Sequence, residues 1–159
     1  MITQQTLVMR YRDAGRRVTT AESCTGGLLS ARITEQPGSS HVFERGFVTY
    51  SNRAKQEMLG VEAETLAAQG AVSEAVAREM AEGALARAHA DVAIAITGIA
   101  GPGGSETKPE GRVCFALAVE GRKTLIQTVE FGPLGRENVR RASVDHAMSM
   151  LDAVVDGAP

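Results

Sequence analysis

Apolar and polar residues follow two periods along the chain, one typical of helices and one typical of strands. A period near 3.6 residues predicts helices over residues 4–12, 28–34, 53–59, 64–69, 73–89 and 136–155. Short runs rich in β-branched or apolar residues predict strands over residues 17–21, 43–50, 91–96, 112–119 and 124–131. Ser73 is suited to be the N-cap of its helix, and Gly121 predicts an antiparallel hairpin between the last two strands.

The order of these elements indicates the fold class. In the strand at 91–96, Val92, Ile94 and Ile96 alternate with alanines, which suits a strand buried on both faces. Strands and helices alternate first, and the hairpin follows before the last helix. We therefore expect an α/β protein, a three-layer α/β/α sandwich with a mixed, mostly parallel sheet, as a single domain over residues 1–159.

Composition narrows the function classes. Of the 159 residues, 43% are apolar and 23% charged, with a net charge of −2, which is typical of an ordinary globular protein. Aromatic residues make up only 4%, and no broad basic surface is indicated, so no direct nucleic-acid binding is expected. No apolar run approaches the ~20 residues of a membrane helix, and the N-terminus lacks a signal-peptide pattern, so a cytoplasmic protein without membrane contact is expected.

Metal and disulfide chemistry are not expected. The two cysteines, Cys24 and Cys114, are too few for a disulfide framework or a Cys-rich zinc site. The three histidines are scattered without metal-ligand spacing. We expect neither a metal nor an organic cofactor.

The segment after the first predicted strand carries the first candidate site. Ser23-Cys-Thr-Gly-Gly27 places a small polar turn and two glycines before a helix, where free amides bind anions or stabilise an oxyanion. No lysine follows the glycines, so this is not a Walker A loop. Cys24 could be the nucleophile instead of Ser23. In the alternative structural interpretation, Ser23 or Thr25 only caps the helix and the glycines only permit a tight turn.

Lys55 is the second candidate. If Asn52 caps its helix, Lys55 lies in the first helical turn, where the helix dipole disfavours a cation, and Arg53 adds a like charge. Both effects predict a lowered pKa that suits a general base. The alternative is an ordinary solvated surface lysine.

Two further segments could contact a ligand. The glycines after the strand at 91–96 allow a backbone to approach a ligand closely, with Gly98 as the foremost point, although residues 103–110 could equally be a mobile surface connection. Arg136, Arg140 and Arg141 open the last helix, where a phosphate or carboxylate ligand would relieve their unfavourable position. A solvated or salt-bridged face is the alternative for these arginines.

Four motifs together carry a resemblance to a known family. They are Thr20-Ala-Glu-Ser-Cys-Thr-Gly-Gly-Leu28, Tyr50-Ser-Asn-Arg-Ala-Lys55, Gly70-Ala-Val-Ser73 and Ile96-Thr-Gly-Ile-Ala-Gly-Pro-Gly-Gly104. Over nearly its whole length the chain resembles the CinA C-terminal domain family, whose enzymatic members are nicotinamide-nucleotide amidohydrolases. Larger members carry an extra N-terminal domain, and this chain is similar to the stand-alone form.

The resemblance implies a reaction in pyridine nucleotide salvage. Family members hydrolyse the carboxamide of nicotinamide mononucleotide to nicotinic acid mononucleotide and ammonia, without a cofactor, and tend toward homo-oligomers. It implies Ser23 as nucleophile, Lys55 as base and Tyr50 as an assisting hydroxyl. In a mechanism that fits this set, the amides near residues 25–27 hold the oxyanion. The implied substrate-binding residues are Thr25, Gly26, Gly27, Thr97, Gly98, Gly101 and Arg140. The chain departs from the family where Phe131-Gly-Pro-Leu-Gly-Arg136 replaces the usual Gly-Asp-Arg approach to the last helix.

Two other functions fit the same sequence. One is a non-catalytic nucleotide-binding or protein-interaction module linked to competence or the DNA damage response. The other is an amidase acting on a different small pyridine or amino-acid amide. A buried base beside Ser23 would favour catalysis, because a binding module has no need of one.

Overall fold

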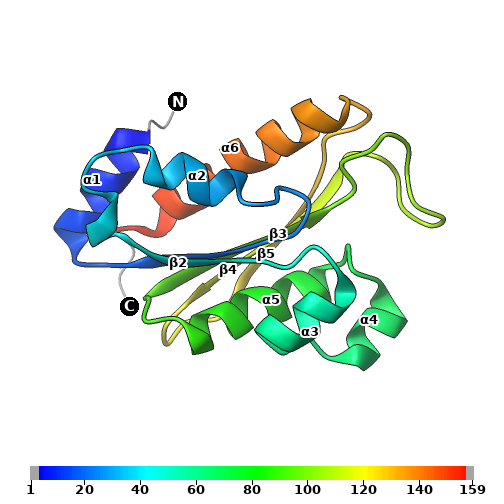
Figure 1. Cartoon of the computed structure of the whole chain (residues 1–159), viewed down its shortest axis with the longest axis horizontal. Helices are drawn as coiled ribbons and strands as arrows, with labels where there is room; N and C mark the ends of the chain where they lie inside the picture. The colour runs from blue at the N-terminus through cyan, green and yellow to red at the C-terminus, as the bar shows by residue number, and fades with distance from the viewer. Residues whose placement is uncertain (1–3, 157–159) are drawn as a thin grey trace.

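The chain alternates strands and helices through its first two thirds and then forms a hairpin before its last helix (Figure 1). The structure is a computed structural model that describes residues 4–156. Its elements are α1 (Gln4–Ala14), β1 (Val18–Glu22), α2 (Leu28–Thr34), the 3₁₀ helix η1 (Ser39–His41), β2 (Phe43–Val48), α3 (Asn52–Leu59), α4 (Ala63–Gln69), α5 (Glu74–Arg87), β3 (Val92–Gly98), β4 (Arg112–Val119), β5 (Leu125–Glu130) and α6 (Arg136–Val154).

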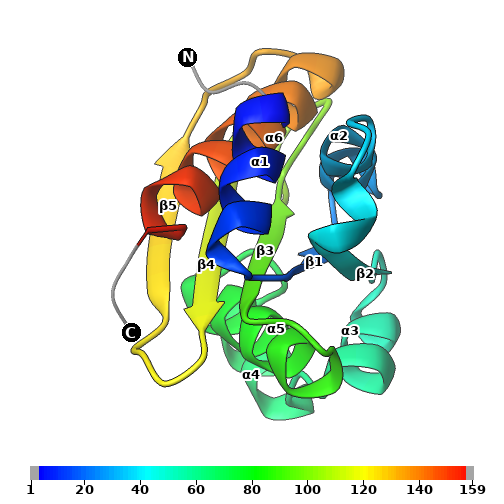
Figure 2. The same ribbon diagram turned by 90° about the vertical axis from the view of Figure 1, so that its left-hand side faces the viewer.

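The strands form one mixed sheet in the order β2-β1-β3-β4-β5. Strand β1 pairs in parallel with both β2 and β3, whereas β4 is antiparallel to its neighbours β3 and β5. Four strands therefore point one way and β4 points the other. Helices α1, α2 and α6 cover one face, and α3, α4 and α5 cover the other (Figures 1 and 2). The predicted three-layer α/β/α sandwich with a mixed sheet is confirmed.

Most element boundaries differ from those predicted by one or two residues; β2, for example, ends at Val48 instead of Tyr50, and α5 ends at Arg87 instead of His89. Three of the differences bear on the site. Glu22 still belongs to β1, and Thr97 and Gly98 still belong to β3, because both strands continue their pairing with neighbours to these residues. Helix α3 is capped by Ser51, not Asn52, since the Ser51 hydroxyl accepts a hydrogen bond from the Ala54 amide at 3.0 Å. Lys55 is therefore the fourth residue of α3.

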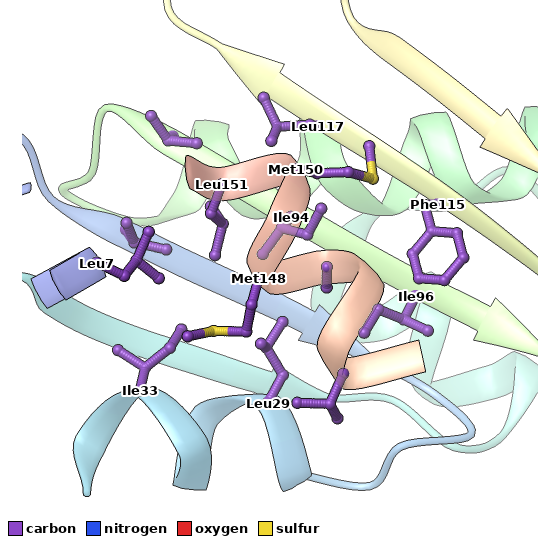
Figure 3. Close-up of a cluster of buried hydrophobic side chains, with 14 of the residues drawn as sticks. Leu7, Leu29, Ile33, Ile94, Ile96, Phe115, Leu117, Met148, Met150 and Leu151 are labelled. Atoms are coloured by element: carbon purple, nitrogen blue, oxygen red, sulfur yellow. The ribbon is translucent and has the colours of Figure 1, made fainter. Parts of the chain in front are cut away.

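One face of the sheet is lined with large side chains. Ile94, Ile96, Phe115 and Leu117 project from β3 and β4 toward α1, α2 and α6. Figure 3 shows them meeting Leu7, Leu29, Ile33, Met148, Met150 and Leu151. Burial of these side chains supplies the main driving force for docking the three helices on this face.

The opposite face is lined with small side chains, which lets α5 lie close to the sheet. The alternate residues of β3 and β4 on this face are Ala93, Ala95, Cys114, Ala116 and Ala118. Helix α5 is also in close contact with the end of α3, since a Cβ atom on Gly83 would lie 1.9 Å from the Leu59 carbonyl oxygen. This contact positions α3, the helix that carries Lys55.

Replacing Gly83 by alanine is expected to destabilise the fold, against the usual helix preference. In an exposed helix this change would stabilise by about 1 kcal/mol. Here the added methyl group would have to displace the Leu59 carbonyl, and overpacking of this kind costs ~1–3 kcal/mol. Urea unfolding measures the effect, with Ala86→Gly at an exposed position of α5 reporting helix propensity alone. A Gly83→Ala protein as stable as the parent would contradict the close contact.

Within residues 4–156, the helices are too short or too polar for any of them to span a bilayer.

Candidate active site

Ser23, Tyr50 and Lys55 meet at the end of the sheet where β1 and β3 finish, at the right-hand side of Figure 1. After β1, the chain passes through α2 to β2, which lies on one side of β1 in the sheet. From β2 it returns through α5 to β3, which lies on the other side of β1. Open α/β sheets bind ligands where the connections diverge in this way. A cavity of about 350 Å³ lies here, lined by Ser23, Cys24, Tyr50, Lys55, Ala71, Val72, residues 97–105 and Arg136.

Glu22 organises the turn after β1. Its buried carboxylate accepts hydrogen bonds from the amides of Gly27 (3.2 Å), Leu29 (2.9 Å) and Ser30 (2.9 Å), and from the Ser30 hydroxyl (2.7 Å). A carboxylate at a helix N-terminus is stabilised by the free amides and the dipole. Glu22 therefore occupies the place where an external anion could have bound. Sequence reasoning missed this role, although an acidic residue at a strand end just before a helix was the available signal.

Ser23 and Lys55 lie side by side in the cavity. The Lys55 Nζ is 2.9 Å from Ser23 Oγ, 2.9 Å from the carbonyl oxygen of Thr49 and 3.4 Å from that of Tyr50. Ser23 is held in turn by its amide, which donates to the β3 carbonyl of Ile96 at 3.0 Å. The two side chains come from separate elements, and the fold brings them within hydrogen-bond distance.

Lys55 is buried, with only 1% of its surface exposed, so it is not a solvated surface lysine. Burial penalises the ammonium and lowers the pKa of Lys55 from 10.5 to about 8. The predicted direction is correct, and the largest cause of the lowered Lys55 pKa is removal from water. Arg53, which was expected to contribute, is exposed and pairs with Glu57 at 2.7 Å.

Cys24 lines the same cavity, but burial keeps its thiol from acting as the nucleophile. Burial raises the pKa of its thiol to about 11, so the thiol is protonated near neutral pH. The Lys55 amine contacts the Ser23 hydroxyl. The geometry thus favours Ser23 over Cys24 as the activated group.

Tyr50 and Arg136 form the mouth of the cavity. Tyr50 is 60% exposed, and its hydroxyl accepts a hydrogen bond from Arg136 at 2.6 Å. Arg136 also donates to the carbonyl oxygen of Gly101 at 2.7 Å. Tyr50 contacts Lys55 through its backbone carbonyl, whereas its hydroxyl is engaged by Arg136.

The structure separates the expected substrate-binding residues into two groups. Thr97, Gly98 and Gly101 line the cavity. The residues that do not line it are Thr25, Gly26, Gly27 and Arg140. The Gly26 amide donates to the Ser23 carbonyl, and the Gly27 amide to Glu22, so neither amide is open to a ligand.

Arg140 contacts the turn from the side away from the cavity. Its Nε donates to the Cys24 carbonyl at 3.0 Å and its NH2 to the Thr25 carbonyl at 3.3 Å. Arg141 is exposed and pairs with Glu137 at 2.8 Å. Of the three arginines considered from the sequence, only Arg136 reaches the cavity.

The glycine-rich segment after β3 is tied to its surroundings. Thr97 donates its hydroxyl proton to the Ala71 carbonyl at 2.9 Å. The Glu110 carboxylate accepts from the amides of Gly103 (2.6 Å) and Gly135 (3.2 Å), and Lys108 donates to the carbonyl oxygens of Gln69 and Val72. These contacts argue against an untethered surface connection for residues 103–110.

Gly98 lacks a side chain for a packing reason. A Cβ atom there would lie 2.7 Å from the Val113 side chain of the neighbouring strand β4. The group that comes close to Gly98 is thus the Val113 side chain of the neighbouring strand, whereas the sequence had led us to expect a ligand there. Between residues 4 and 156, no cluster of three or more His, Cys, Asp or Glu side chains could hold a metal ion.

Comparisons of the sequence with known proteins agree on one family. The sequence model of the CinA C-terminal domain matches residues 2–155. A putative competence-damage inducible protein of Symbiobacterium thermophilum is 52% identical over 148 residues, which covers 87% of this chain and 34% of the relative. A CinA-like protein of Mycolicibacterium gilvum is 52% identical over 145 residues, covering 91% and 34%. The chain thus spans about a third of the length of these curated relatives.

Solved structures are similar over almost the full chain. The competence/damage inducible protein CihA from Agrobacterium tumefaciens has 47% identity and a TM-score of 0.92, covering 95% of this chain and 92% of its own. A CinA superfamily protein from Escherichia coli has 38% identity and a TM-score of 0.90, covering 96% and 90%.

Proposed function

This chain belongs to the CinA C-terminal domain family, and from that premise we propose that it hydrolyses the carboxamide of nicotinamide mononucleotide to nicotinic acid mononucleotide and ammonia. The observation that carries the proposal is the buried Lys55 amine 2.9 Å from the Ser23 hydroxyl oxygen, at the wall of a cavity. A buried amine costs stability, and a role as base accounts for its presence.

Lys55 is arranged to take the Ser23 proton. A neutral amine has two N–H donors and one lone pair. The carbonyl oxygens of Thr49 and Tyr50 accept the two donors, which leaves the lone pair directed at the Ser23 hydroxyl. This is the Ser–Lys form of nucleophile activation.

The reaction then proceeds in two halves. Ser23 Oγ attacks the carboxamide carbon as its proton moves to the Lys55 Nζ, forming a tetrahedral oxyanion. The oxyanion collapses, the C–N bond breaks, and Lys55 returns the proton to the departing amine, which leaves as ammonia. Water then attacks the resulting ester as its proton moves to neutral Lys55, the bond from the acyl carbon to Ser23 Oγ breaks, and Lys55 returns the proton to Oγ, which releases nicotinic acid mononucleotide and free Ser23.

The cavity suits a mononucleotide. Its volume of about 350 Å³ lies within the ~300–1,000 Å³ of small-molecule sites. Arg136 places a guanidinium at the cavity mouth beside the Tyr50 hydroxyl, and a guanidinium matches a phosphate in charge and geometry. We assign the phosphate to Arg136, with Tyr50 beside it, and the carboxamide to the Ser23–Lys55 end.

The direct test measures ammonia release from nicotinamide mononucleotide and identifies the second product by chromatography. Nicotinamide riboside, which lacks the phosphate, should react with a much higher KM. No ammonia from a folded protein would overturn the proposal for this substrate. Ammonia release from other amides, but not from nicotinamide mononucleotide, would show that the cavity takes a different amide. Tight binding of nicotinamide mononucleotide without turnover would favour the non-catalytic nucleotide-binding module.

The pH dependence should show the lowered pKa of Lys55. Because the base must be neutral, kcat/KM is expected to rise with pH, with a midpoint at about 8, and to level off above it. An ordinary lysine, with a pKa of 10.5, would place the midpoint far higher. Initial rates across this range, with unfolding monitored in parallel, give the profile. A profile without a rising limb would contradict Lys55 as the base.

A further inference from the structure

We propose that Glu110 is a positioning residue that holds Arg136 at the cavity mouth and so sets the preference for a substrate that carries a phosphate. The inference rests on the proposed function, in which Arg136 receives the phosphate. Glu110 itself is not among the residues that line the cavity, so it acts through Arg136.

The Glu110 carboxylate joins two segments that meet at the cavity mouth. Its Oε1 accepts a hydrogen bond at 2.6 Å from the amide of Gly103, in the loop after β3. Its Oε2 accepts a hydrogen bond at 3.2 Å from the amide of Gly135, directly before α6. A carboxylate is suited to this bridge, because both of its oxygens are acceptors. Glu110 thus fixes the spacing between the loop and the start of α6.

Glu110 is anchored to the sheet by the residue that follows it. The Gly111 amide donates to the Ile99 carbonyl at 2.8 Å, and the Gly111 carbonyl accepts from the Phe131 amide at 2.8 Å. These two bonds tie residue 111 to the chain just beyond the ends of β3 and β5. The carboxylate therefore extends from a fixed backbone, and its own hydrogen bonds carry that position to the cavity mouth.

Arg136 depends on both of the segments that Glu110 joins. It is the first residue of α6, and its guanidinium donates to the Gly101 carbonyl at 2.7 Å and to the Tyr50 hydroxyl at 2.6 Å. The Glu110 carboxyl packs against the same glycine, because a Cβ atom on Gly101 would lie 2.6 Å from the Glu110 Cδ. Without the bridge, the Gly101 carbonyl and the helix start would lose the spacing that the guanidinium spans. A long side chain with many rotamers would then turn into solvent.

The bridge leaves the charge of Arg136 available to a ligand. Arg136 is exposed, and neither of its two acceptors is a carboxylate. Within residues 4–156 it forms no ion pair, because the Glu110 oxygens bind backbone amides instead. An unpaired guanidinium at a cavity mouth is suited to bind a phosphate. Glu110 therefore holds the cation in place without pairing with it.

The test compares nicotinamide mononucleotide with nicotinamide riboside, which lacks the phosphate, in the parent and in Glu110→Gln. A glutamine side chain has a single acceptor oxygen, so it can serve only one of the two amides. The change also removes a negative charge near the phosphate site, and this effect alone would tighten the binding of an anion. Loss of positioning weakens that binding, so the direction of the change distinguishes the two effects.

Glu110→Gln is expected to raise KM for nicotinamide mononucleotide by about tenfold, as the loss of a hydrogen bond to a charged group does. The kcat for the nucleotide and the kcat/KM for the riboside should stay within about twofold of the parent, because neither depends on the phosphate contact. Glu110→Asp keeps the charge but is too short to reach both amides, so it should raise KM similarly. Glu106→Gln is the matched control, since it removes the same charge at an exposed position of the same loop. Its KM should equal that of the parent.

Arg136→Ala supplies a second measurement. In that background, Glu110→Gln should not raise KM further, because a positioning residue acts only through the group that it positions. A further rise as large as the one in the parent would overturn the inference.

Calorimetry of both compounds gives binding affinities that do not depend on turnover. Nucleotide affinity that falls in Glu110→Gln, without ammonia release by the parent, would support the inference and refute the proposed function. Ammonia release by a parent that binds nucleotide and riboside equally well would overturn the inference and leave the proposed reaction in place. Tighter nucleotide binding in Glu110→Gln, or equal losses of kcat/KM for both compounds, would also overturn it. If thermal unfolding shows that Glu110→Gln does not fold, Glu110→Asp alone must show the rise in KM.

Discussion

Replacing Ser23 by alanine is expected to reduce ammonia release from nicotinamide mononucleotide by about 10⁴–10⁶-fold, as loss of a nucleophile does in serine hydrolases. The hydroxyl is the group that the Lys55 amine contacts at 2.9 Å, and the Cys24 thiol beside it is held protonated by its raised pKa. No side chain at the turn can therefore take over the attack. The change removes a single oxygen atom, so the fold should persist.

Steady-state rates with ammonia detection measure this loss, and thermal unfolding checks the fold. Cys24→Ala is the matched comparison, because it alters the neighbouring side chain and retains the Ser23–Lys55 pair. It should keep activity within about tenfold of the parent, since its thiol takes no part in the attack. The opposite pattern, with Cys24→Ala inactive and Ser23→Ala active, would make Cys24 the nucleophile.

Lys55→Met is expected to abolish activity to a similar degree and to change how stability depends on pH. Methionine has nearly the same length and no titratable group, so the buried site stays filled while the base is lost. In the parent, the folded pKa of about 8 lies below the ordinary value of 10.5. At pH 7 both the folded and unfolded states carry the proton, and the folded state bears the full penalty of a buried ammonium.

The sign of the pH effect follows from proton binding. Between pH 8 and 10.5 the unfolded state binds more protons at Lys55 than the folded state does, so the parent gains stability as pH rises. Relative to Lys55→Met, the gain from pH 7 to pH ~10 should be on the order of 2–3 kcal/mol. Hydrogen bonds lost in the variant affect both pH values similarly and largely cancel in this difference.

Urea unfolding of parent and variant at the two pH values gives the comparison. Lys123→Met is the matched control, because it makes the same lysine-to-methionine change at an exposed position. Identical pH dependence in the parent and Lys55→Met would show that Lys55 titrates normally, which would remove the physical basis for its role as base.

The arrangement of the site shows how far sequence reasoning reaches. Arg136 and Arg140 lie one helical turn apart near the start of α6, so periodicity cannot distinguish them. The docking of α6 on the sheet places Arg136 at the cavity mouth and Arg140 behind the nucleophile turn. The resemblance pointed to Arg140 of this helix as a substrate contact, whereas the arginine that lines the cavity is Arg136.

Lys55 and Glu22 illustrate the same limit in electrostatics. Local reasoning about the helix dipole and Arg53 predicted the direction of the Lys55 pKa shift, while the cause is burial by segments distant in the chain. Glu22 was assigned to a turn. Its hydrogen bonds to the amides at the start of α2 became visible only when the strand end and the helix start were placed together.

The sequence by itself determined the order of helices and strands, the three-layer sandwich with its mixed sheet, and the segments that carry the candidate site residues. These features depend on hydrophobic periodicity and on turn residues within a few positions of one another. The tertiary structure alone decided which side chains meet. Lys55 contacts Ser23 at 2.9 Å although the two residues are 32 positions apart, and this packing also excludes water from Lys55. Arg140 donates a hydrogen bond to the Cys24 carbonyl although more than 100 positions separate them. Such contacts arise from the packing of whole elements, and no local pattern encodes them.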